Sequence, residues 1–471
     1  MLDSDTRQQL STHQKALRIN LDASRYGTFA EIGAGQEVAR WFFKVGAAAG
    51  TISKTMSAYD MAVSDDIYGP VERYVSRARL SQMLEREFAQ VVGRLAAKRP
   101  PTTQFFAYAA TVTARSFRQK NECHGWIGLR LQHAPGAAPS DIVLHVRMLD
   151  NDNAQQSEAL GILGVNLVHG AFFHTGRPDW IIEGLGDNLG SERIEVDLIH
   201  FSGPGFAGVE NRLMNLHLIR SWLTRAVIFA PDGEVVVPRE LFYRKPVMVM
   251  RGSFKPVTRV NVDMMSAALS QFARVSEVDE TRTVALAEVT MNSLVTGDDV
   301  DAADFLARMD LLGECGYTVM ISDYVRFFRL RAYLRRYTHE PIGIALSVRD
   351  FAQLFDENYY EGLEGGMLEA FGKLFPDHTH VYVYPSRPAG SDRLVTLDNV
   401  EVPRHLRHLL AHLVENGKLV AVERYDESLL AIDAGEVLAA IARGDADWAA
   451  QVPPAVAERI RREGLFGHPS R

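Results

Sequence analysis

The sequence contains little cysteine and no long apolar segment. Its 471 residues include two cysteines, Cys123 and Cys315, whose separation matches no zinc or redox motif. A disulfide framework is therefore excluded, and a reducing compartment is favoured. No apolar run reaches the roughly 18 residues that a membrane helix needs, and the polar, acidic start of the chain does not resemble a signal peptide. We expect a cytoplasmic protein without a membrane partner.

The sequence also lacks an excess of positive charge. Lys and Arg total 51 against 59 Asp and Glu, so the formal net charge is −8. This balance favours solubility and provides no general attraction to nucleic acid, which is therefore not expected as a partner. The hydrophobic content of 46% is typical of a globular protein that can bury large cores.

The length predicts two or three domains. We predict an α/β protein with three regions. Residues 1–240 would form a mixed α/β domain with an antiparallel hairpin and long helices. Residues 241–392 would form an α/β domain of the nucleotide- or phosphate-binding kind, and residues 393–471 a small, mainly helical region.

Apolar patterns predict different sheets in the two halves. In the first half, alternating residues over 126–132 and 142–149 flank a Pro- and Gly-rich turn, which predicts an antiparallel hairpin. In the second half, near-continuous apolar runs alternate with helical stretches. Strands of that kind belong to a mostly parallel sheet with helices on both faces. The runs occupy residues 246–251, 318–322, 342–347 and 380–384.

The segment from Gly252 to Asn261 points most directly to a chemistry. It combines a strand end, a tight Gly/Pro turn and a helix start, an arrangement in which backbone amides and a helix N-terminus hold phosphate. It resembles the nucleotidylyltransferase signature Gly-(Ser/Thr)-Phe-Asp-Pro-x-(His/Thr)-x-Gly-His. The residues that match are Gly252, Ser253, Phe254, Pro256 and Thr258.

Three residues depart from that signature. Lys255 replaces its acid, Val260 its second Gly, and Asn261 its final His, which is the residue most closely tied to catalysis. Lys255 still provides a positive charge for phosphate. The alternative is a purely structural turn, in which Gly252 allows the bend and Thr258 or Asn261 caps the next helix.

A second segment resembles another signature of the same enzymes, Ile-Ser-Ser-Thr-x-Ile-Arg. In Ile321–Arg326, Ser322 matches its first Ser and Arg326 falls one position before its Arg, whereas its Ser/Thr pair is missing. The resemblance implies that both residues hold phosphate. The alternative for Ser322 is a helix N-cap.

Two further patterns allow weaker interpretations. Gly33 and Gly35 fit the start of a dinucleotide-binding Gly-x-Gly-x-x-Gly, but Val38 stands at its third glycine position. The helix predicted from Arg326 to Tyr337 carries arginines with interleaved aromatics, which suits RNA or phosphate, although a solvated basic face is the commoner outcome.

Over its whole length the chain resembles an uncharacterised family of bacterial cytoplasmic proteins. The resemblance rests on residues 29–42, 146–150 and 251–258. Members carry two transferred names, nicotinate-nucleotide adenylyltransferase and TonB-dependent receptor. The first name agrees with the Gly252–Thr258 pattern. The second does not agree with the alternation of strands and helices in the second half.

We therefore predict a nucleotide- or phosphate-binding protein and, if it is catalytic, adenylyl transfer to a mononucleotide with ATP and Mg²⁺. Lys255 and Arg326 would be catalytic. The phosphate-binding residues would be Gly252, Ser253, Phe254, Thr258, Asn261 and Ser322. No residue is assigned to a metal. The alternative is a non-enzymatic, oligomeric interaction or scaffold protein.

Overall fold

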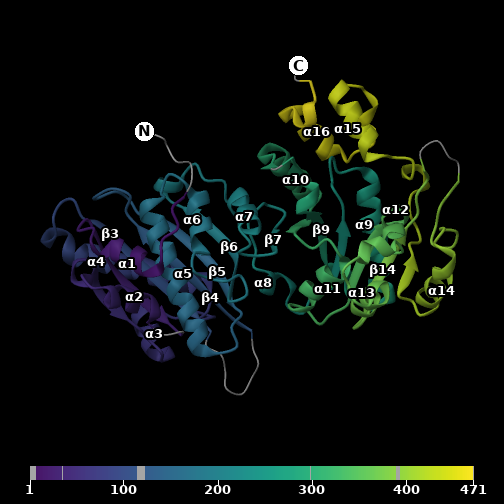
Figure 1. Ribbon diagram of the computed structural model, residues 1–471. Helices are drawn as coiled ribbons and strands as arrows, with labels where there is room; N and C mark the ends of the chain where they lie inside the picture. The colour runs from purple at the N-terminus through teal and green to yellow at the C-terminus, as the bar shows by residue number, and fades with distance from the viewer. Residues whose placement is uncertain (1–6, 34–35, 114–121, 298, 389–392, 470–471) are drawn as a thin grey trace. The chain divides into compact units, whose positions relative to one another are not determined.

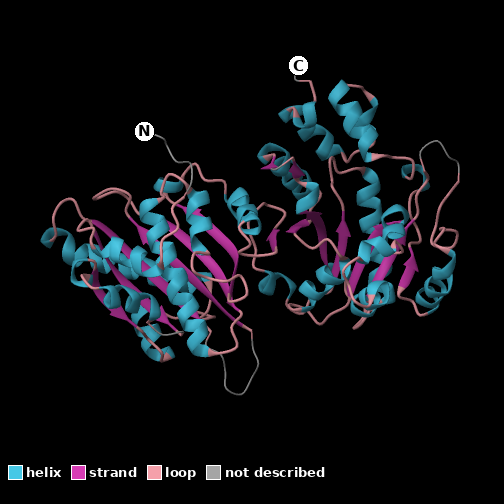
Figure 2. Ribbon diagram, viewed as in Figure 1, coloured by secondary structure: helices cyan, strands magenta, loops and turns pink. Residues whose placement is uncertain are grey.

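The computed structural model describes residues 7–33, 36–113, 122–297, 299–388 and 393–469. The chain divides into two compact units, Met1–Val227 and Ile228–Arg471 (Figure 1). The α/β class predicted from the sequence is confirmed, since both units combine a sheet with helices (Figure 2). The three regions predicted by residue range stay a prediction.

The first unit contains, within the described residues, a six-stranded sheet of order β2-β1-β3-β4-β5-β6. Its strands are β1 (Arg25–Ile32), β2 (Ile52–Met56), β3 (Gln104–Val112), β4 (Cys123–Leu131), β5 (Ser140–Met148) and β6 (Ile194–Ser202). β1 is parallel to β2 and β3, and the pairs from β3 to β6 are antiparallel. The hairpin predicted from alternating residues is confirmed as β4 and β5.

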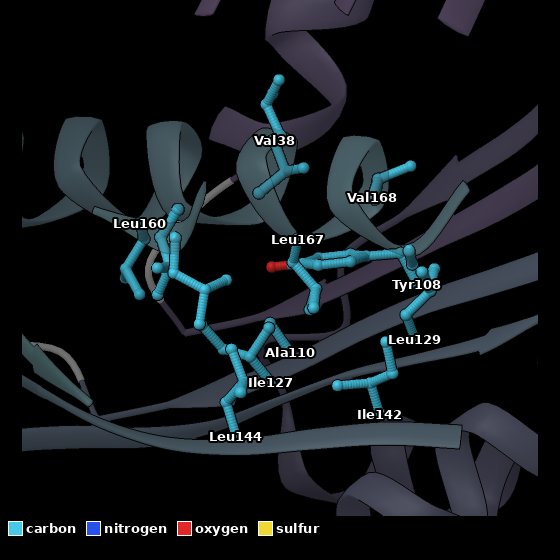
Figure 3. Close-up of a cluster of buried hydrophobic side chains, with 14 of the residues drawn as sticks. Val38, Tyr108, Ala110, Ile127, Leu129, Ile142, Leu144, Leu160, Leu167 and Val168 are labelled. Carbon is cyan, nitrogen blue, oxygen red and sulfur yellow. The ribbon is translucent and has the colours of Figure 1, made fainter. Parts of the chain in front are cut away.

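The larger core cluster of the first unit lies between this sheet and α5, and a smaller one lies between β3 and α4. The helices are α1 (Thr12–Asn20), α2 (Glu37–Val45), α3 (Met61–Tyr68), α4 (Arg77–Leu95), α5 (Asn153–Phe173), α6 (Pro178–Leu185) and α7 (Asn211–Arg220). Figure 3 shows strand side chains such as Ile127 and Leu144 facing Leu160 and Leu167 of α5. Gly164 is needed there, because a Cβ atom at that position would lie 2.4 Å from Val38.

The second unit is built on a parallel sheet. Its described order is β15-β14-β13-β8-β9-β12-β7, and the pairs from β15 to β12 are all parallel. These strands are β7 (Ala226–Phe229), β8 (Val247–Arg251), β9 (Val284–Thr290), β12 (Thr318–Ser322), β13 (Ile342–Ser347), β14 (Thr379–Tyr384) and β15 (Leu419–Ala421). β10 (Val295–Thr296) and β11 (Asp299–Val300) form a separate hairpin.

Helices cover both faces of this parallel sheet (Figure 2). They are α8 (Pro238–Phe242), α9 (Arg259–Val275), α10 (Ala302–Glu314), α11 (Phe327–Arg335), α12 (Val348–Gln353), α13 (Gly366–Leu374), α14 (Arg407–Glu415), α15 (Ala434–Arg443) and α16 (Pro454–Glu463). α9 packs against β8, β13 and β14, and α10 packs against β12. Because helices lie on each side, the strands are apolar along most of their length, as the runs at 246–251 and 342–347 predicted.

Candidate functional site

The strand order of the second sheet reverses between β8 and β13. From β8 the chain adds β9 and then β12 on one side; it then returns to the other side of β8 and adds β13, β14 and β15. The order of these six strands is that of doubly wound dinucleotide-binding sheets. In such sheets, ligands bind outside the carboxyl ends of the strands, at the point of reversal.

A crevice of about 540 Å³ occupies this point. Its size is in the range of small-molecule sites. It is bordered by the turn after β8, the start of α9, the ends of β13 and β14, and the segment that leads into α15. Its lining residues include Gly252, Ser253, Phe254, Thr258, Val260, Asn261, Ser347, Arg349, Asp350, Tyr384 and Asp433.

Five of the eight predicted site residues, all from the first signature, border this crevice. Gly252 leaves room for the ring of Phe254, since a Cβ atom would lie 3.0 Å from that ring. Within the described residues, no acceptor receives the backbone N–H groups of Ser253, Phe254 or Val260. Two of these donors lie in the turn after β8 and one in the first turn of α9, which is a suitable arrangement for an anion.

Thr258 and Asn261 also fulfil the structural alternative. Thr258 is the N-cap of α9. The Asn261 Oδ1 atom accepts hydrogen bonds of 2.9 Å from both the backbone N–H and the hydroxyl of Thr258. The first N–H of α9, that of Arg259, donates to the Gln451 carbonyl at 2.9 Å. These contacts occupy part of the helix start and hold the turn in one shape.

Lys255 does not line the crevice. Its Nζ atom lies 2.8 Å from Asp304 Oδ1. Asp304 also contacts Arg308, which is buried and donates to the carbonyl groups of Ser253 and Ser293 at 3.2 and 2.9 Å. This network of two cations and one acid supports the turn from the side of α10.

Ser322 and Arg326 also bond to protein groups outside the crevice. Ser322 is fully buried, and its hydroxyl donates to Glu288 of β9 at 2.5 Å. It also accepts the N–H of Tyr324 at 3.2 Å. Arg326 is the N-cap residue of α11, and its side chain donates to the carbonyls of Tyr359 and Glu361.

Arg251 links the two predicted signatures. It makes a bidentate pair with Glu288, with distances of 2.7 and 2.9 Å, and donates to the carbonyls of Tyr324 and Val325 at 2.6 Å. Burial opposes its charge, but the Glu288 carboxylate raises the pKa of Arg251 above its ordinary value. Sequence reasoning missed this ion pair, because nothing local relates Arg251 to an acid 37 residues away.

The β13 side of the crevice carries exposed charge. Ser347 caps α12, and its hydroxyl donates to Asp350 at 2.7 Å. Arg349, which is 52% exposed, lies 3.2 Å from Asp433, the N-cap of α15. Burial opposes the charge of Asp433, yet Arg349 and the amides of α15 lower its pKa, so this carboxylate is ionised.

Tyr384 closes the β14 side. Its hydroxyl donates to Asp263 Oδ2 at 2.6 Å, and burial together with that carboxylate raises the pKa of the tyrosine. Sequence reasoning missed Arg349, Tyr384 and Asp433 as crevice residues. One signal was present for Tyr384, which ends a predicted strand, where doubly wound sheets place their ligands.

The dinucleotide interpretation near the N-terminus meets a different arrangement. At the start of α2, the Glu31 carboxylate accepts the backbone N–H groups of Val38 and Ala39 at 3.1 and 3.2 Å. It therefore occupies the position where a dinucleotide fold would place phosphate. Burial raises the pKa of Glu31 to about 7, although these two hydrogen bonds oppose the increase. Gly35 lies outside the described residues.

No family model matches the chain, and no curated protein matches it. Matching solved structures include a competence/damage-inducible protein, CihA, of Agrobacterium tumefaciens: 18% identity, TM-score 0.25, covering 35% of this chain and 97% of that one. Another is a competence or damage-inducible protein of Enterobacter asburiae: 11% identity, TM-score 0.25, coverages 34% and 96%. A CinA superfamily protein of Enterobacter cloacae has 13% identity, a TM-score of 0.24 and coverages of 36% and 98%. Matches this weak carry no argument about function.

No helix in the described part of the chain combines the length and the apolar character that crossing a membrane requires. Among the same residues, no group of three His, Cys, Asp or Glu side chains could hold a metal ion.

Proposed function

We propose that the second unit binds a nucleotide, or another small phosphorylated ligand, in the crevice between the carboxyl ends of β8 and β13. One observation carries the proposal. At the point where the strand order reverses, the backbone N–H groups of Ser253, Phe254 and Val260 have no acceptor within the described residues. Phosphate oxygens would satisfy these donors, and the dipole of α9 would favour the negative charge.

The ligand class is a mononucleotide or a pyrophosphate ester. A dinucleotide site holds its ribose with an acid at the end of the second strand. Here the acid of that strand, Glu288, is fully buried and bonded to Arg251 and Ser322. The charged groups that border the crevice include Arg251, which is held by Glu288, and Arg349, Asp350 and Asp433 on the β13 side.

For the reaction at this site, we propose adenylyl transfer to a mononucleotide. In it, Lys255 and Arg326 neutralise charge on the transferred phosphate. Lys255 lies in the turn between the crevice residues Phe254 and Pro256, so exchanging Asp304 for phosphate would bring its ammonium group to the ligand. Arg326 would have to exchange its two carbonyl partners.

A Mg²⁺ ion fits the crevice only together with a nucleotide. In nucleotide sites this ion is held by one or two carboxylates and by the phosphates of the substrate. Asp350 and Asp433 are the carboxylates that line the crevice. When bound, the ion would neutralise phosphate charge, and Ser347 would keep Asp350 in place through its hydroxyl.

Thermal unfolding of the full chain against ATP, pyrophosphate, nicotinate mononucleotide and NAD, with and without Mg²⁺, tests the proposal. We expect ATP and pyrophosphate to raise Tm and NAD to leave it unchanged. Arg349→Ala should weaken pyrophosphate binding about tenfold or more, since it removes a charge-assisted hydrogen bond worth about 1.5–3 kcal/mol.

The matched control is Arg443→Ala. Arg443 is also an exposed arginine paired with an aspartate, Asp445, in the second unit, but it does not line the crevice. The affinity of the Arg443→Ala variant for pyrophosphate should equal that of the wild type. A wild-type Tm that no phosphorylated ligand changes would refute the proposal. Unchanged affinity in Lys255→Ala would remove Lys255 from the site and leave the crevice proposal intact.

A further inference from the structure

A second surface of the parallel-sheet unit shares no residue with the crevice. α11 packs against α13, and Figure 1 shows the two helices side by side. Between them lies an open groove of about 620 Å³. Its lining residues are Tyr324, Phe328, Arg329, Arg331, Ala332, Arg336, Leu363, Gly372, Lys373, Pro376 and Asp377. Four of these carry positive charge and one carries negative charge.

The exposed side of α11 provides two cations, whose guanidinium groups lie 6.0 Å from the ring centroids of neighbouring aromatic residues, Arg329 from Phe328 and Arg336 from Tyr333. Arg329, Ala332 and Arg336 are exposed, whereas Leu330 and Tyr333 between them are buried. Neither Arg329 nor Arg336 has an acidic partner among the described residues. They are seven residues apart, so their side chains leave the same side of the helix about 10 Å apart along its axis.

The other two cations of the groove are held in place. Arg331 donates to Asp377 at 2.7 Å and to the Pro376 carbonyl at 3.1 Å. Lys373 lies 2.5 Å from Glu369, one turn earlier in α13. These pairs hold Arg331 and Lys373 in place and neutralise their charge, so attraction to an anion rests mainly on Arg329 and Arg336.

We propose that this groove binds single-stranded nucleic acid. The positive row of Arg329 and Arg336 suits a chain of repeated phosphates. Ala332 between them is small and lets a backbone come close. Tyr324, Leu363 and Pro376 add partly exposed ring and aliphatic surface for bases. A basic groove with such surface is the usual form of sequence-tolerant single-strand sites. Since the whole chain carries a net charge of −8, binding would be confined to this groove.

The test measures fluorescence anisotropy of a labelled 12-nucleotide oligouridylate with the full chain at 50 and 200 mM salt. We expect the double variant Arg329→Ala/Arg336→Ala to bind about tenfold or more weakly than the wild type. The logarithm of the affinity falls with the logarithm of the salt concentration. Each lost phosphate contact makes this negative slope less steep by about 0.7, so two lost contacts make it less steep by about 1.4.

The control is Arg404→Ala/Arg407→Ala, which removes two charges from exposed positions, one in the 3-10 turn before α14 and one at its first residue. It should bind like the wild type. The proposal is overturned if the wild type does not bind at 50 mM salt, or if both double variants lose affinity equally. It is also overturned if polyglutamate of equal charge competes as well as RNA, because the groove would then take an acidic protein segment. Saturating pyrophosphate should not compete, so this result is independent of the crevice.

Discussion

Two glutamates removed from water show how single residues constrain this protein. Glu288 is fully buried, yet its carboxylate receives the guanidinium of Arg251 and the hydroxyl of Ser322. Removing one partner of such a buried pair typically costs about 3–5 kcal/mol. Among the residues that the structure describes, Glu31 has no cation partner of this kind. It receives two backbone amides at the start of α2, and its pKa is raised to about 7 by burial.

The raised pKa of Glu31 predicts that stability depends on pH. Between an unfolded pKa near 4.5 and a folded pKa of about 7, the folded state holds a proton that the unfolded state has released. Stability therefore falls as pH rises through this window. Relative to Glu31→Gln, the free energy of unfolding of the wild type should decrease by about 2–3 kcal/mol from pH 5 to pH 8.

Urea denaturation of both proteins at pH 5, 6, 7 and 8 measures this difference. Glu37→Gln is the control, because Glu37 is a neighbouring carboxylate on α2 whose charge acts on Glu31 only at a distance. If the free energies of unfolding of the wild type and Glu31→Gln differ by the same amount at all four pH values, the carboxylate is ionised throughout and its pKa is ordinary.

At the scale of elements, close backbone approach decides where a helix can sit. α10 passes the turn after β7 at Gly313. A Cβ atom at that position would lie 2.3 Å from the Pro231 carbonyl oxygen, which is backbone and cannot rotate away. By contrast, Gly372 in α13 has open space around its Cα atom. The two glycines therefore have different reasons to be present.

Alanine at these two glycines should change stability in opposite directions. Gly313→Ala should lower the free energy of unfolding by about 1–3 kcal/mol, since α10 must move away from Pro231. Gly372→Ala should raise it by about 0.5–1 kcal/mol, because alanine is the better helix former and meets no atom. Urea denaturation measures both. A neutral Gly313→Ala would mean that α10 moves at no cost.

At the scale of the whole molecule, each of the two units has its own sheet and its own helices. The larger core cluster of the first lies between the sheet and α5, and the crevice belongs entirely to the second. Ligand binding stabilises only the native structure that holds the site. The crevice and the core around Glu31 should thus respond to different perturbations.

Calorimetry should therefore show two unfolding transitions. Pyrophosphate should raise the Tm of one of them. At a pyrophosphate concentration of about 100 times Kd, binding adds about 2.7 kcal/mol to the free energy of unfolding. This corresponds to a rise in Tm of about 5–10 °C for a unit of this size. Gly313→Ala should lower the Tm of the transition that pyrophosphate raises, and Glu31→Gln should affect the other at pH 8. A single transition that every perturbation moves would contradict independent unfolding of the units.

Much of the local structure could be predicted from the sequence, whereas β9 could not. The strands at 246–251, 318–322, 342–347 and 380–384 were predicted from apolar runs and are present as β8, β12, β13 and β14. β9 contains Glu288 in an otherwise apolar run. An acid at a buried strand position is tolerated only because Arg251 and Ser322 reach it from neighbouring strands, and sequence alone does not reveal that pairing.

The candidate site divides in the same way. The turn from Gly252 to Thr258 was predicted from residues adjacent in sequence, and it borders the crevice. Arg349, Tyr384 and Asp433 reach the same crevice from segments 90 to 180 residues later. Similarly, Lys373 joins the arginines of α11 only because α13 packs beside that helix.

The α/β class, the hairpin of β4 and β5, and the turn after β8 could be predicted from the amino-acid sequence, because each depends on periodicity and turn chemistry within a few residues. The strand order, the reversal between β8 and β13, and the meeting of charged side chains in the crevice and the groove became visible with the folded chain. Those features depend on contacts between distant segments, whose energies are set by burial and pairing.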